Sequence, residues 1–71
     1  MITLAETLKL VEPECDEKDL FYIKKHGTTK TEIFNNAEEV RRAFDVENTY
    51  VVRVRPHFVG SIYEGLDIEF L

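Results

Sequence analysis

The sequence predicts an α+β fold with the order α-β-β-α-β-β. We expect a four-stranded, mostly antiparallel sheet with both helices on one face. Three observations predict this fold: two amphipathic segments with helix-capping residues, two pairs of β-forming segments joined by turns, and a length of only 71 residues. Helices that each precede a hairpin bury their apolar sides against one face of the sheet. A chain this short makes one domain, so residues 1–71 should form a single small α+β unit.

The first helix begins after Thr3. Thr3 and Glu6 have the spacing of a capping box, in which the hydroxyl and the carboxylate each bond an amide at the helix end. Apolar residues then recur at helical spacing, at Leu4, Leu8 and Val11. Pro13 restricts the residue before it, so the helix should end near Val11.

The first hairpin joins residues 20–25 to residues 31–35. Gly27 can adopt positive φ in the turn between them. A two-residue His26-Gly27 turn and a four-residue HGTT loop both place Tyr22 on the same face as Ile33, so the register stays open.

The second helix is capped by Asn35 or Asn36. Two glutamates follow in its first turn, where the helix dipole favours negative charge. Its apolar stripe is made by Ala37, Val40 and Phe44. The final hairpin should begin at Thr49.

Two arginines and two acids alternate with apolar residues in that last hairpin. Because successive strand residues face opposite sides, Arg53 and Arg55 share one face, and Asp67 and Glu69 share one face of the last strand. If the apolar faces match, Arg53 lies across from Glu69 and Arg55 across from Asp67, or diagonally if the register slips by two. Opposite charges across a sheet contribute about 0.2–1 kcal/mol each, which explains the arginines without any ligand.

The turn conflicts with this register. A Gly60-Ser61 turn pairs Val59 with Ile62 and, followed back strictly, places Arg53 on the wrong face. Either the loop has an odd number of residues or a bulge corrects the parity, and Pro56 is a natural place for the irregularity.

The same arginines support a second hypothesis. Tyr22, Tyr50 or Phe58 could stack bases beside a cationic sheet face that binds single-stranded nucleic acid. The residues of that basic face are Lys24, Lys25, Lys30, Arg53 and Arg55, with His26 beside them. The simpler alternative is a solvated face or a lysine-protected edge. Nine basic against fourteen acidic residues, a net charge of −5, disfavour nucleic acid as the partner.

Metal, cofactor and catalytic motifs are absent. Cys15, His26 and His57 are the only soft ligands and lack the spacing of a zinc site. Cys15 lies among acids, which oppose formation of a nucleophilic thiolate. No phosphate-binding loop or hydrolase motif occurs, so we expect a non-enzymatic protein with no cofactor.

The composition also bears on location. No apolar run reaches the roughly 20 residues that span a bilayer. The first residues lack a basic leading region and a small-residue cleavage site, and a single cysteine suits a reducing compartment. We therefore expect a cytoplasmic protein without membrane contact.

The aromatic residues suggest how such a protein would act. An antiparallel sheet covered by helices on one face leaves the other face open. Tyr22, Phe58 and Tyr63 are the candidates for a protein-binding or dimer surface there, and this is the favoured function. The alternatives are the nucleic-acid binder and an acidic mimic of DNA that occupies a nucleic-acid enzyme.

The opening MITLAETLKLVEP, followed by two hairpins, resembles small uncharacterised proteins of phages and mobile elements of Gram-positive bacteria. Those proteins often open with a short T-L-x-E-x-L-x-x-V-like helix and end on a β-strand. The resemblance implies an accessory protein that acts by contact with host or phage machinery. It transfers no functional residue.

Overall fold

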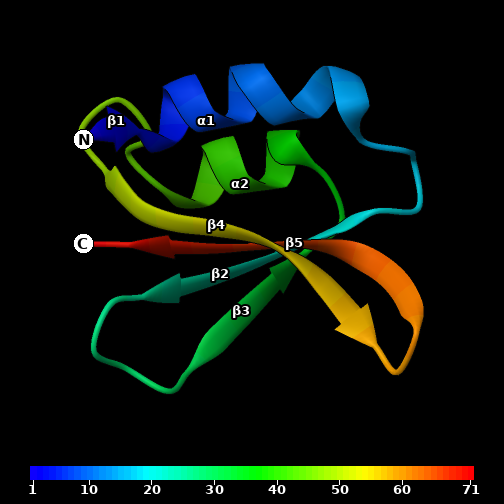
Figure 1. The fold of residues 1–71 in the computed structure, drawn as a ribbon. Helices are drawn as coiled ribbons and strands as arrows, with labels where there is room; N and C mark the ends of the chain where they lie inside the picture. The colour runs from blue at the N-terminus through cyan, green and yellow to red at the C-terminus, as the bar shows by residue number, and fades with distance from the viewer.

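The computed structural model describes all 71 residues and has an α+β fold. Two α-helices lie on one side of a curled sheet (Figure 1). The longest helix has eight residues, and no helix has the length and apolar character needed to cross a membrane. The elements in chain order are β1 (Ile2–Thr3), α1 (Leu4–Val11), the 3₁₀ helix η1 (Glu12–Glu14), β2 (Leu20–Lys25), β3 (Thr31–Phe34), α2 (Ala37–Ala43), β4 (Tyr50–Val59) and β5 (Ile62–Phe70).

The sheet has five strands in the order β1-β4-β5-β2-β3, so the prediction of four strands was one short. The extra strand, β1, has two residues and pairs Ile2 with Val51 and Thr3 with Tyr50. It exists because an N-cap residue has extended backbone, and Thr3, at φ −81° and ψ 162°, continues the ladder up to the first turn of α1.

Three of the four strand pairings are antiparallel, as expected, but β2 and β5 are parallel. Parallel neighbours need a long crossover between them. Here the chain between β2 and β5, which contains β3, α2 and β4, provides the crossover and brings the last strand against the first strand of the other hairpin. The sheet is therefore mixed.

The helix ends follow the sequence closely. The capping box is present: Thr3 Oγ1 accepts from the Glu6 amide at 3.1 Å, and Glu6 Oε1 accepts from the Thr3 amide at 3.0 Å. α1 ends at Val11, and Pro13 lies in η1, where its missing N–H costs nothing. Of the two candidate caps for α2, the structure uses Asn36, whose side chain accepts from the Glu39 amide at 2.9 Å.

The core lies between the helices and one face of the sheet. Each helix contributes the residues of its predicted stripe, Leu4 and Leu8 from α1 and Ala37 and Val40 from α2. The strands contribute Phe21, Ile23, Val51 and Ile68. The opposite face of the sheet has no helix over it, so the polar residues that alternate with these core residues are left on an open face.

The open register of the first hairpin is settled by the pairs Tyr22 with Ile33 and Lys24 with Thr31. In the same register the next residues along the ladder are Lys25 and Lys30, so the loop between the strands is the four-residue HGTT segment, residues 26–29. The Thr28 amide donates to the Lys25 carbonyl at 3.1 Å within it.

The second hairpin contains the expected bulge. Val59 pairs with Ile62, and the register shifts between His57 and Phe58, where Glu64 is the additional residue on β5. The bulge is not at Pro56, which pairs with Leu66. It forms beside Gly65, whose φ of +154° suits glycine. A second shift lies between Val51 and Arg53.

Candidate functional site

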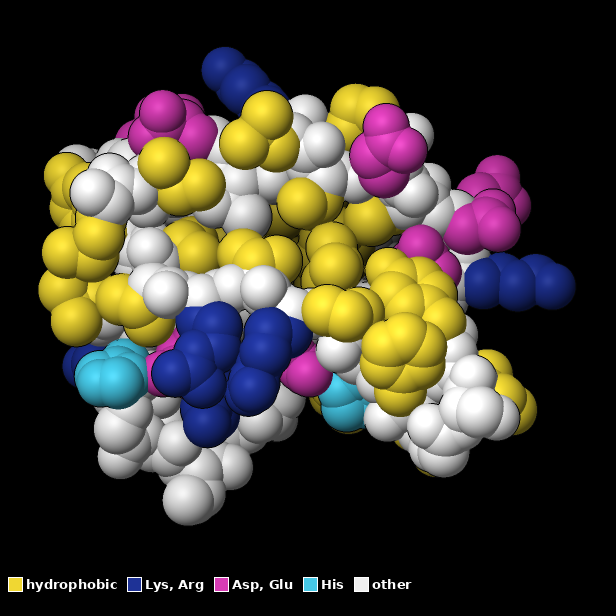
Figure 2. Space-filling view, viewed as in Figure 1, with side chains coloured by type: hydrophobic (Ala, Val, Ile, Leu, Met, Phe, Trp, Pro, Cys, Tyr) yellow, Lys and Arg dark blue, Asp and Glu magenta, His cyan; other side chains and the backbone are white.

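The open face of the sheet carries a row of charged side chains. Arg53 lies across from Glu69 and Arg55 across from Asp67, the register expected from the sequence. Lys24 of β2 lies beside Glu69 on the other side of β5. Figure 2 shows a central group of Lys and Arg side chains with a histidine on each side.

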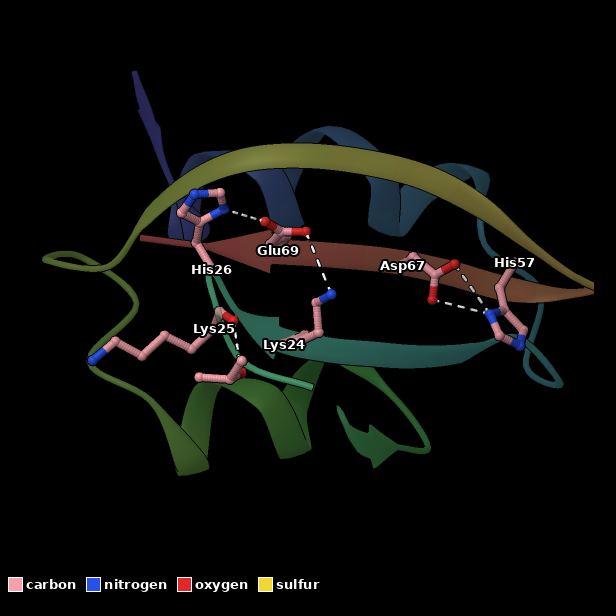
Figure 3. A network of polar contacts seen from close by, with 7 residues as sticks. Lys24, Lys25, His26, His57, Asp67 and Glu69 are labelled. Atoms are coloured by element: carbon pink, nitrogen blue, oxygen red, sulfur yellow. Dashed lines mark hydrogen bonds and ion pairs between the residues drawn. The ribbon is translucent and has the colours of Figure 1, made fainter. Parts of the chain in front are cut away.

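Cross-strand register does not produce the expected arginine ion pairs, however. Neither Arg53 nor Arg55 has a carboxylate oxygen within 4.0 Å. Glu69 instead bonds His26 Nδ1 and lies 3.9 Å from Lys24 Nζ. Asp67 lies 3.0 and 3.1 Å from His57 Nδ1 through its two oxygens (Figure 3). Because a carboxylate only accepts, His57 donates an Nδ1–H.

Glu69 is held by cations from two strands and the first loop. Its side chain is only 12% exposed. The hydrogen bond from His26 lowers the pKa of Glu69, against the opposing effect of burial, and Lys24 and Arg53 lower the pKa further. The carboxylate therefore stays ionised and is already satisfied by its own neighbours.

Tyr22 lies on the open face but is covered. Its ring stacks on His57 with centroids 3.8 Å apart and planes 16° apart, and its hydroxyl donates to Glu64 at 3.2 Å. Burial, and then the hydrogen bond to Glu64, raise the pKa of Tyr22. At 9% exposure, Tyr22 supports the packing of this face rather than offering a free aromatic ring.

A hollow of about 160 Å³ lies over the charged row. Three members of the predicted basic face line it, namely Lys24, Arg53 and Arg55. Lys25 and Lys30 lie apart from these and line a different hollow of about 210 Å³ with Phe44 and Phe70. The structure thus divides the predicted basic face into two groups, and the first contains both arginines.

Phe58 and Tyr63 lie elsewhere, at the turn end of the β4–β5 hairpin. They pair across the strands and their rings pack edge to face with centroids 5.8 Å apart. Val59 and Ile62, the next pair, also lie exposed. We call these four residues the hairpin tip. Their exposed fractions are 54% for Phe58, 55% for Val59, 67% for Ile62 and 42% for Tyr63.

The acids lie mostly on the helix side of the molecule, as Figure 2 shows. Glu12 of η1 forms an ion pair with Arg41 of α2 at 2.7 Å, and this hydrogen bond lowers the pKa of Glu12. Burial raises the pKa of the Cys15 thiol, and nearby Asp19, Glu12 and Glu14 raise it further. No three His, Cys, Asp or Glu side chains converge as metal ligands.

Two groups in the site did not stand out in the sequence as part of it. His57 continues the alternation of Arg53 and Arg55 past Pro56, so the period of two could have identified it. Val59 and Ile62 flank the predicted turn. They are exposed because the pairing of β2 with β5 begins only at Leu20 and Gly65, a long-range pairing that no local pattern reveals.

Comparisons with known protein families, with curated proteins and with solved structures find no match for this chain.

Proposed function

We propose that this protein is a non-enzymatic protein–protein interaction module that associates with a second copy of itself through the hairpin tip. The observation that carries the proposal is the unsupported end of the β4–β5 hairpin. β2 pairs with β5 only from Gly65 onward, and β1 covers only Tyr50 and Val51 of β4. Residues 58–63 therefore extend past the other strands as a two-stranded ribbon (Figure 1).

Such a ribbon is marginally stable alone in water, because it buries little apolar surface. The hairpin tip nevertheless presents four large apolar side chains. Clustered exposed aromatic and branched residues are typical of protein interfaces, and Tyr and Phe are enriched there. A partner that covers the tip would bury this surface and support the ribbon.

The charge of the tip permits a second copy as the occupant. The chain has a net charge of −5, so two copies repel one another over most of their surface. Residues 58–63, FVGSIY, contain no charged side chain. The four side chains of the tip therefore bring no like charge of their own between two copies, although burial and then nearby Asp19 raise the pKa of Tyr63.

The test is size-exclusion chromatography with light scattering over a range of protein concentrations and at low and high salt. Ile62→Glu places a charge in the interface and should weaken dimerisation at least about tenfold, which corresponds to 1.4 kcal/mol. Leu10→Glu is the matched control, because Leu10 is 69% exposed and belongs to α1, not to the hairpin tip.

Dimerisation of the wild type should persist at high salt, since burial of apolar surface is not screened. A wild-type chain that stays monomeric at millimolar concentration contradicts the proposal. Equal weakening by Leu10→Glu and Ile62→Glu would also contradict it, because the interface would then not be specific to the tip.

A further inference from the structure

We propose that the hollow on the open face binds a phosphoryl group through Arg53, Arg55 and Lys24. This site is separate from the hairpin tip and does not depend on self-association. The cationic groups come from two strands, β4 and β2, that β5 separates. Their convergence on one hollow is therefore a product of the fold rather than of the sequence order.

The guanidinium groups of Arg53 and Arg55 are not paired with any acid of the chain. Every other arginine of the chain has an acidic partner: Arg41 has Glu12, and Arg42 has Glu38 at 3.8 Å. Arg53 and Arg55 have none within 4.0 Å although Asp67 and Glu69 lie directly across the ladder. Their five donors each are left for water or for a ligand.

The neighbouring acids are already engaged. His57 bonds both oxygens of Asp67, and His26 bonds Glu69, whereas Lys24 Nζ lies 3.9 Å from Glu69 without a hydrogen bond to it (Figure 3). The acids therefore anchor the histidines at the two ends of the row. The hollow itself is lined by three cationic side chains against these two carboxylates.

The geometry of the donors also favours a phosphoryl group. Residues two apart on a strand lie about 6.6 Å apart, so both arginine side chains can reach one group placed between them. Lys24 and the hydroxyl of Thr31 line the same hollow. Donors from four side chains exceed what one carboxylate uses, whereas a phosphoryl group has three terminal oxygens and suits bidentate arginine contacts.

The test is a titration followed by ¹H–¹⁵N NMR, with inorganic phosphate as the probe and chloride at matched ionic strength as the reference. Phosphate should cause saturable shifts of the Arg53 and Arg55 side-chain Nε–H signals, which chloride does not reproduce. A second titration, with a single-stranded oligonucleotide of about eight nucleotides, shows whether the phosphoryl group belongs to a nucleic acid or to a small molecule. Tighter binding at the same signals assigns the site to a nucleic-acid backbone, and binding of phosphate alone assigns it to a small phosphorylated molecule.

Variants separate the site from general charge. Arg53→Gln and Arg55→Gln should each weaken phosphate binding about tenfold, as expected for loss of a charge-assisted hydrogen bond. Arg42→Gln is the matched control, because Arg42 lies 76% exposed on α2, outside the hollow. Asp67→Asn removes a repelling charge and should tighten binding, a gain that misfolding cannot produce.

Three results would overturn the proposal. The first is the absence of any saturable shift with phosphate or the oligonucleotide. The second is an equal loss of affinity in Arg42→Gln. The third is oligonucleotide binding that maps to Lys25 and Lys30 instead of the arginines.

Discussion

At the scale of single residues, Gly65 is the one of the three glycines where an added side chain would clash. It has φ +154° and lies opposite Leu20 in the parallel pairing of β5 with β2. A Cβ built at this position would lie 1.9 Å from the Leu20 carbonyl oxygen. The absence of a side chain thus permits both the bulge at Glu64 and the close approach of the two strands.

Gly65→Ala should therefore destabilise the protein by more than about 2 kcal/mol, because the strain combines a disfavoured backbone with a clash against main chain. Urea denaturation followed by circular dichroism measures the change. Gly60→Ala is the control, since Gly60 also has positive φ, +64°, but has nothing within 4 Å of the added carbon. A Gly65→Ala variant no less stable than Gly60→Ala would show that β2 and β5 do not pack as described.

Glu69 gives the fold a dependence on pH. The His26 hydrogen bond, helped by Lys24 and Arg53, lowers the pKa of Glu69 below its ordinary 4.5. A carboxylate whose pKa is lower in the folded state stabilises the fold above the unfolded pKa, and this contribution is lost as the pH falls through the folded value.

Glu69→Gln should accordingly be less stable than the wild type at pH 7, and the difference should shrink as the pH falls below about 4.5. Thermal unfolding measured between pH 7 and pH 3 tests this. Glu47→Gln is the control, because Glu47 is exposed and makes no side-chain hydrogen bond or ion pair. A stability difference for Glu69→Gln that is independent of pH would refute the assigned role.

At the scale of elements, local patterns predicted the helices almost to the residue. The capping box at Thr3 and the proline at position 13 set the limits of α1 by local chemistry alone. The same patterns missed β1, because two residues of extended backbone carry no periodicity. They left the choice between Asn35 and Asn36 open, since either amide can cap a helix.

Asn36→Ala should cost about 1 kcal/mol of stability, because it removes the side-chain acceptor for the Glu39 amide. Asn35→Ala should cost clearly less, since its side chain contacts only Glu39 Oε atoms at 3.4 Å. Chemical denaturation of both variants makes the comparison. The reverse order of effects would place the cap one residue earlier than the structure does.

Local patterns likewise predicted one part of the candidate site and missed another. Alternation in the strands correctly placed Arg53 across from Glu69. Turn chemistry left a choice between an odd-numbered loop and a bulge, and the structure has the bulge. The predicted arginine ion pairs were wrong because other side chains bind the two acids: His26 and Lys24 contact Glu69, and His57 contacts Asp67. Lys24 and His26 approach Glu69 only because β2 lies parallel to β5. That pairing joins segments about 45 residues apart, beyond the reach of any local pattern.

At the scale of the whole molecule, the two faces of the sheet differ in composition: one is apolar and the other is charged. One side and both helices make the core, and the other side carries the charged row. The β4–β5 hairpin is longer than the strands beside it, so its tip projects beyond both. We propose that a second copy binds at this tip.

The most direct test mixes isotope-labelled and unlabelled chains and records nuclear Overhauser effects between molecules. The account predicts intermolecular contacts from the rings of Phe58 and Tyr63 to the methyl groups of Val59 and Ile62, with none from Leu10. Contacts located instead at the other exposed apolar group, formed by Met1, Ile2, Tyr50, Val52 and Leu71, would contradict it. A complete absence of intermolecular contacts at millimolar concentration would contradict it equally.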